Sequence, residues 1–185
     1  TEAERLSPAL RDRLGQAIDY LETLTREYSN KEEGAGEVAL QESVEPYPLH
    51  LITRAVENMF SGEASEAGVK LHVEGSDALT DVPALALIRA TSNLVANALR
   101  HAHASGIAVE VETQAGSPRL IVRDDGQGMD ASTLTDAQSA GAKSAESEGD
   151  GLGLAIVHDL AARHGFDFTI RSTPGEGTLA ALTLS

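Results

Sequence analysis

The chain has 185 residues, of which 41% are hydrophobic, and it contains no cysteine and carries a formal charge of −15. This composition suits one folded domain with a small appendage, and it excludes a disulfide framework and a thiolate metal site. The acidic charge and the scarcity of aromatic residues exclude nucleic acid as a partner, because such binding needs a basic face or bases stacked on aromatic rings.

The first predicted element is a long helix over residues 4–29. Leu14, Ile18, Leu21 and Tyr28 recur at helical spacing and form an apolar stripe. Such a stripe must be buried against another helix or a second copy of the chain, so we expect a homodimer through this helix. Domain boundaries follow at 1–30 for the helix, 31–37 for a polar linker, and 38–185 for the main domain.

The main domain alternates between strand and helix patterns. This alternation predicts an α/β (α+β) two-layer sandwich, with a mixed sheet covered on one face by about three helices. No apolar run reaches membrane-spanning length, so we expect no membrane segment and a cytoplasmic location, while the parent protein could be membrane-anchored. The predicted strands are 38–44, 69–73, 107–111, 120–122, 166–171 and 178–184, and the predicted helices are 49–60, 83–103 and 152–164, the second opened by Asp81 and Pro83.

Residues 124–153 contain scarcely any large apolar side chain. A loop of this length inside a compact domain is usually functional or disordered. Glycine clusters bracket it, DDGQG at one end and GDGLG at the other, and they would let the segment hinge over a ligand. We therefore interpret it as a mobile lid.

Two asparagines, Asn93 and Asn97, share one face of the helix 83–103. An amide oxygen suits Mg²⁺ when phosphates supply the other ligands. The alternative, which the pair taken alone favours, is that both are solvent-facing polar residues. The DDGQGM run after a strand is either a tight turn or a carboxylate fixed to accept from an exocyclic amine.

The GDGLG run opens a helix, where backbone N–H groups favour phosphate.

Taken in order, NLVANALRHA, DDGQGM, a lid, GDGLGLAIV and GEGTLAAL resemble the GHKL ATPase superfamily, whose fold is the Bergerat fold. The resemblance covers about residues 38–185 and implies ATP and Mg²⁺ as ligands. It implies that Asn97 holds Mg²⁺, with Asn93 helping through a phosphate or a metal-bound water. It further implies that Arg100 reaches the phosphates, and that His101 lies beside the ribose or adenine.

The same resemblance assigns the adenine and lid residues. Asp124 would accept from the adenine amino group, Gly126 and Gly128 would let the ring lie against backbone, and Thr178 would support this end. The lid glycines Gly149, Gly151 and Gly153, with Leu154 beside them, would hinge the lid and present N–H groups to phosphate. Lys143 is either a γ-phosphate contact or a solvated loop lysine. The phenylalanine box of many members is missing, since only Leu134 is large there.

The branch of the superfamily depends on Asn93. Hydrolytic members carry Glu at this position to orient water, whereas an amide cannot take a proton and suits transfer to an outside nucleophile. In this respect the chain looks like a sensor histidine kinase, an ATP-dependent protein histidine kinase of two-component signalling. The alternatives are a non-enzymatic phosphotransfer scaffold with a degenerate pocket, and a slow ATPase or serine kinase.

Sensor histidine kinases phosphorylate a histidine in a two-helix hairpin and pass the phosphoryl group to a response regulator. The helix 4–29 resembles the second helix of that hairpin but contains no histidine. We therefore expect either that the chain is separated from its first hairpin helix or that the acceptor belongs to another protein. His158 and His50 lack the surrounding acceptor motif, and neither is expected to be phosphorylated.

Overall fold

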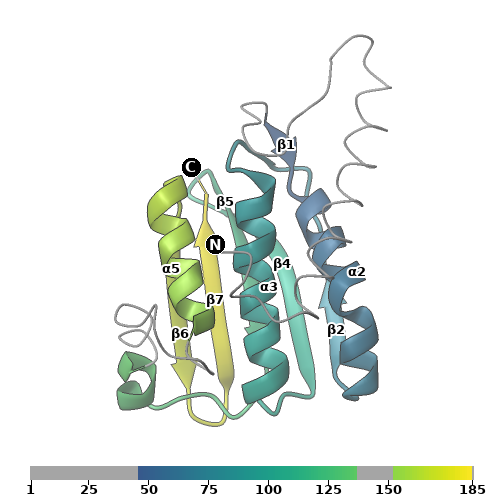
Figure 1. Ribbon diagram of the computed structural model, residues 1–185, viewed down its shortest axis with the longest axis vertical. Helices are drawn as coiled ribbons and strands as arrows, with labels where there is room; N and C mark the ends of the chain where they lie inside the picture. Colours follow the sequence, from purple (N-terminus) through teal and green to yellow (C-terminus); the bar gives the residue numbers. More distant parts are fainter. Residues whose placement is uncertain (1–45, 137–151, 185) are drawn as a thin grey trace.

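The computed structural model describes residues 46–136 and 152–184. Within these ranges, helices cover one face of a five-stranded sheet (Figure 1). The predicted two-layer α+β sandwich is confirmed. The helices are α2 (His50–Glu66), α3 (Ala84–His101) and α5 (Leu152–His164), and the sheet strands are β2 (Lys70–Val73), β4 (Gly106–Gln114), β5 (Ser117–Asp124), β6 (Asp167–Thr173) and β7 (Gly177–Thr183).

The strand order is β2-β4-β5-β7-β6, and only the β2–β4 pair is parallel. The chain passes from β2 through α3 to β4, as a parallel pair requires a crossover. Alternation along each strand turns one set of side chains toward the helices. The register aligns Val109, Val122 and Ala180 in one such row, and all three are buried.

The helices bury their apolar stripes on this row. Leu87, Ile88 and Val95 of α3 have no exposed surface, as expected for the apolar stripe of a helix that packs on a sheet. In α2, Phe60 is 1% exposed, so truncating it to Ala would cost about 3–5 kcal/mol of stability. Helix α3 begins directly after Pro83 without a side-chain cap, so the predicted opening role of Asp81 is wrong.

A second, two-stranded sheet pairs β1 (Tyr47–Pro48) with β3 (Leu79–Thr80), which the sequence patterns did not predict. The Tyr47 hydroxyl donates to the Val82 carbonyl oxygen at 2.6 Å. Burial raises the pKa of the Tyr47 hydroxyl well above its usual range, and the negative charge of Asp81 adds to the shift. This hydrogen bond holds the start of the described chain against the segment that leads into α3.

Residues 131–136 are helical, so the interpretation of the whole 124–153 segment as a loop is wrong. Asp130 Oδ1 accepts from the Thr133 backbone N–H at 2.8 Å and from the Ser132 hydroxyl at 2.8 Å, as a helix N-cap does. The predicted helix 4–29 and strand 38–44 lie outside the described residues, as does most of the expected lid. None of the described helices combines the length and hydrophobicity needed to cross a bilayer.

Candidate active site

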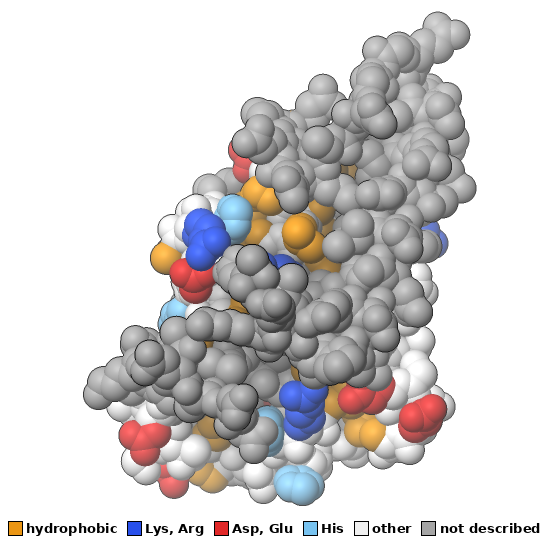
Figure 2. Space-filling model, in the orientation of Figure 1, with side chains coloured by type: hydrophobic (Ala, Val, Ile, Leu, Met, Phe, Trp, Pro, Cys, Tyr) orange, Lys and Arg blue, Asp and Glu red, His pale blue; other side chains and the backbone are white. Residues whose placement is uncertain are grey.

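A pocket of about 430 Å³ opens between α3, the start of α5 and the ends of β5, β6 and β7. In the view of Figure 2, described hydrophobic and histidine side chains lie at the lower edge of the molecule, with acidic side chains on both sides. The pocket has apolar walls and a few polar groups, as small-molecule sites do. Its lining residues are Leu94, Asn97, Ala98, His101, Ala102, Val122, Asp124, Gln127, Gly128, Met129, Thr133, Gly153, Leu154, Ile170, Thr178 and Ala180.

Asp124 is the buried charge of this pocket, at 7% exposed. Its Oδ1 accepts from the backbone N–H groups of Gly126 at 3.0 Å and Thr178 at 3.3 Å. Burial raises the pKa of its carboxyl, the two backbone hydrogen bonds lower it, and the charge of Asp125 raises it further. No described donor reaches the other carboxylate oxygen, Oδ2. Every buried side-chain oxygen of the described residues has a hydrogen-bond partner, so Oδ2, which has none, is not buried and is accessible from the pocket.

Thr178 lies opposite Asp124 in the β5–β7 register, so strand pairing itself brings these two predicted residues together. The Thr178 hydroxyl is 2.9 Å from the Ser172 hydroxyl, and either oxygen can donate. Ser172 Oγ also accepts from the Met129 backbone N–H at 2.8 Å. This network fixes the segment after DDGQG against β6 and β7.

Asn97 lines the pocket from α3, and Gly153 of α5 lies against its amide. A Cβ atom on Gly153 would be 2.8 Å from Asn97 Oδ1 and 2.9 Å from Nδ2, closer than real Cβ contacts allow. The second glycine cluster therefore has a packing role that its sequence did not reveal. Glycine at this position lets α5 approach α3 while leaving the Asn97 amide in place.

The DDGQG turn packs its glycines against backbone. A Cβ on Gly126 would be 2.1 Å from the Ala102 carbonyl oxygen, and one on Gly128 would be 1.9 Å from that of Thr173. Gly128 also has a φ of +64°, which disfavours any side chain. Gln127 ties the same turn to the end of α3, since its Nε2 donates to the His101 carbonyl oxygen at 3.1 Å.

The structure brings together Asn97, His101, Asp124, Gly128, Gly153, Leu154 and Thr178 in one pocket. Three predicted residues lie outside its lining. Asn93 donates from Nδ2 to the Arg89 carbonyl oxygen at 2.7 Å, and Arg100 is exposed in the last turn of α3. The Gly126 backbone N–H donates to Asp124 Oδ1, so Gly126 holds the carboxylate without lining the pocket. Lys143, Gly149 and Gly151 lie outside the described residues.

Sequence reasoning missed the walls of the pocket. Val122, Ile170 and Ala180 lie side by side across β5, β6 and β7 and form an apolar surface. Gln127, Met129 and Thr133 come from the segment after the first glycine cluster. Strand alternation could have indicated that Val122 and Asp124 share a face, but the neighbours from β6 and β7 depend on long-range register.

Comparison with known proteins shows which family the chain resembles. The family model described as "Histidine kinase-, DNA gyrase B-, and HSP90-like ATPase" matches residues 83–185. An uncharacterized sensor-like histidine kinase of Rhizobium meliloti is 32% identical to the chain over 76% of its length, covering 28% of that relative. Sensor histidine kinase ZraS of Escherichia coli is 28% identical over 74% of the chain and 32% of the relative. The chain thus spans about a third of the length of these curated relatives.

Solved structures share the fold. The histidine kinase domain of the Erythrobacter litoralis blue-light activated kinase EL346 has a TM-score of 0.61 and 20% identity, covering 94% of this chain and 78% of that one. Full-length ShkA in complex with AMPPNP has a TM-score of 0.63 and 23% identity, covering 89% and 35%. The chain belongs to the histidine kinase-, DNA gyrase B- and HSP90-like ATPase family, as an ATP-binding catalytic domain of the sensor histidine kinase type.

Proposed function

We propose that the chain binds Mg²⁺-ATP in the described pocket and transfers the γ-phosphoryl group to a histidine outside this chain, in two-component signalling. The single observation that carries the proposal is Asp124, a buried carboxylate with one oxygen held by backbone and the other accessible from an apolar pocket. Such an oxygen is a strong acceptor, and the exocyclic amino group of adenine is a matching donor. The flat apolar surface of Val122, Ile170 and Ala180 suits the base itself.

The phosphate end of the nucleotide would lie toward Asn97 and the start of α5. The Asn97 amide oxygen fits Mg²⁺, which takes few protein ligands when phosphates complete its shell. When bound, Mg²⁺ neutralises charge that builds up on the phosphates during transfer. The first turn of α5 adds a helix N-terminus, which favours anions, and His101 is exposed at the same mouth. Arg100, Lys143 and the glycines Gly149 and Gly151 remain candidates for phosphate contacts.

Phosphoryl transfer, as opposed to hydrolysis, is proposed from the chemistry of Asn93. Its amide cannot accept a proton from water, and its Nδ2 is hydrogen-bonded to the Arg89 carbonyl oxygen one turn earlier in α3. An acceptor histidine nitrogen would attack the γ-phosphorus, a P–N bond would form, and the bond to the β–γ bridging oxygen would break to release ADP. The chain would act mainly by positioning and by electrostatic stabilisation.

The acceptor histidine of this proposal would belong to a segment or protein outside this chain. All six histidines of the chain are described, and none lines the pocket except His101 at its mouth. We propose a phosphoacceptor hairpin and a response regulator as partners, and a homodimer through residues 1–30. Light scattering on the chain and on a deletion of residues 1–30 would test the dimer. A monomeric parent chain would refute it.

The decisive experiment combines nucleotide titration with a transfer assay. Calorimetric titration of ATP should give binding that depends on Mg²⁺, whereas GTP should bind much more weakly because guanine carries an acceptor where adenine has its amino group. Labelled γ-phosphate should then reach a histidine hairpin protein in an acid-labile form. Absence of ATP binding would overturn the proposal in favour of a scaffold. Binding followed by release of free phosphate alone would favour an ATPase.

A further inference from the structure

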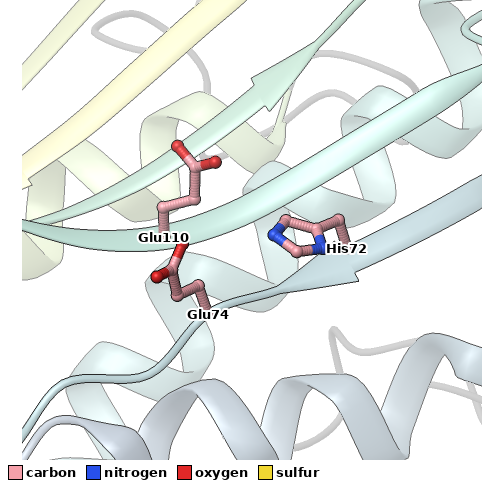
Figure 3. Close-up of side chains that lie close together, drawn as sticks. All are labelled: His72, Glu74 and Glu110. Atoms are coloured by element: carbon pink, nitrogen blue, oxygen red, sulfur yellow. The ribbon is translucent and has the colours of Figure 1, made fainter.

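Three side chains with metal-binding atoms converge on the face of the sheet that turns away from the helices. They are His72 and Glu74 of β2 and Glu110 of β4 (Figure 3). Their ligand atoms all lie within 4.8 Å of one another. We propose that they form a binding site for a divalent transition-metal ion of the Zn²⁺ class, separate from the nucleotide pocket and independent of the proposed kinase function.

The backbone fixes this convergence. His72 and Glu74 are two residues apart on one strand, so their side chains share a face. In the parallel register His72 lies opposite Ala108, and the Glu74 backbone N–H donates to the Val109 carbonyl oxygen at 2.9 Å. Glu110 therefore stands beside Glu74, and the small Ala108 leaves room for the imidazole ring above β4.

The three side chains are uncommitted in the described part of the chain. None of them makes a hydrogen bond or an ion pair with another described residue. Two carboxylates are thus held close together with no described lysine or arginine paired to them. Like charges at this distance repel, and a divalent cation would neutralise both.

The donor set selects the class of ion. An imidazole nitrogen disfavours Mg²⁺ and Ca²⁺, which prefer oxygen ligands, and favours Zn²⁺ and its neighbours in the first transition series. With bonds of about 2.0–2.2 Å to Zn²⁺, tetrahedral ligands lie about 3.3–3.6 Å apart. Rotamer changes of the two long glutamate side chains can close the remaining gap. His72 and Glu74 are exposed, so water would complete the coordination.

Binding there would join an edge strand to its neighbour. β2 has four residues, and among the described strands of the main sheet it pairs with β4 alone, so an ion held by both strands would oppose opening of this edge. Because the site lies on the opposite face from Asp124 and Asn97, it should not need nucleotide. The ion is therefore predicted to raise thermal stability in the absence of ATP.

The test is a titration of untagged, nucleotide-free chain with ZnCl₂ in a buffer that does not chelate metal. We expect one equivalent of Zn²⁺ to bind and to raise the melting temperature. Both His72→Ala and Glu110→Gln should weaken this binding at least about tenfold and abolish the thermal shift. Glu112→Gln, which changes an exposed glutamate two residues further along β4, is the matched control and should bind like the parent.

A second measurement locates the bound ion and distinguishes this site from the other histidines of the chain. Paramagnetic Co²⁺ should selectively broaden the backbone amide resonances near residues 72–74 and 108–112 in a nuclear magnetic resonance spectrum. Loss of these effects in His72→Ala would support the proposal. Unchanged Zn²⁺ affinity in His72→Ala, broadening centred on His101 and His103 instead, or no stoichiometric binding would each overturn it.

Discussion

Replacing Asp124 with Asn separates the contribution of this side chain to nucleotide binding from its contribution to stability. Asn retains an oxygen that can accept from Gly126 and Thr178, as Oδ1 of Asp124 does now. In that orientation its amide nitrogen replaces Oδ2 and presents a donor to the adenine amino group. Loss of one charge-assisted hydrogen bond is worth about 1.5–3 kcal/mol, so ATP affinity should fall roughly 10- to 150-fold. The preference for ATP over GTP should shrink, because an amide can donate to the guanine carbonyl.

The free energy of unfolding of Asp124→Asn should rise, whereas its ATP affinity falls. Burial raises the pKa of Asp124 above its usual range, so the ionised carboxylate is less favourable in the folded chain than in the unfolded chain. The parent chain should therefore lose stability as pH rises through this raised pKa, while Asp124→Asn should not. In thermal melts between about pH 4 and pH 7, the melting temperature of Asp124→Asn relative to that of the parent chain should increase with pH.

Asp125→Asn is the matched control at the next position. Asp125 is exposed and accepts from the Ser105 backbone N–H, the Ser105 hydroxyl and the Gly106 backbone N–H. The Ser105 hydroxyl foremost, then the Gly106 N–H, lower the pKa of Asp125. This variant should lose stability above the usual Asp pKa and retain ATP affinity. Unchanged ATP affinity in Asp124→Asn would refute the adenine contact, and equal losses in both variants would refute the division of roles.

Two further variants test the metal end of the pocket and the branch of the family. Gly153→Ala places a Cβ 2.8 Å from Asn97 Oδ1, so Mg²⁺-dependent ATP affinity should fall about tenfold by calorimetry. Gly62→Ala in α2, whose added Cβ meets nothing within 4 Å, should instead stabilise the chain by about 0.5–1 kcal/mol without changing affinity, and equal affinity losses in both would contradict the Asn97 argument. Asn93→Glu supplies a possible base and should raise the ratio of phosphate release to transfer at least about tenfold, while an unchanged ratio would count against the role assigned to Asn93.

Helices and strands with strong apolar periodicity could be predicted from the sequence because their patterns are local. Helix α3 repeats its buried residues at helical spacing, and β4 alternates Ile107 and Val109 with more exposed residues. The helix at 131–136 was missed because it has almost no apolar stripe. Its signal was Asp130 followed three residues later by Thr133, which is an N-cap pattern.

Within the candidate site, polar residues in short motifs could be predicted, and residues supplied by register could not. Asp124 and Asn97 stand in recognisable runs, and the structure places both in one pocket. Ile170 and Ala180 are ordinary strand residues in sequence, and they line the pocket only because β6 and β7 pair beside β5 in one particular register. The contact between Gly153 and Asn97 is likewise invisible before α5 is packed on α3.

The two neighbouring aspartates show how the fold accommodates a destabilising group at its binding site. At the end of β5, Asp124 turns toward the buried pocket, while Asp125 holds Ser105 and Gly106 at the start of β4. The carboxylate of Asp124, whose burial is unfavourable, is therefore next in sequence to that of Asp125, which accepts three hydrogen bonds. Gly126 follows both and packs too closely on Ala102 for any side chain. The Gln127 backbone N–H donates to the Ala102 carbonyl oxygen at 2.8 Å, and its Nε2 donates to that of His101, so the turn is tied to the end of α3. A variant that loosens Asp125 should consequently destabilise the contact between this turn and the start of β4, while Asp124 keeps its hydrogen bonds to Gly126 and Thr178 and its place in the pocket.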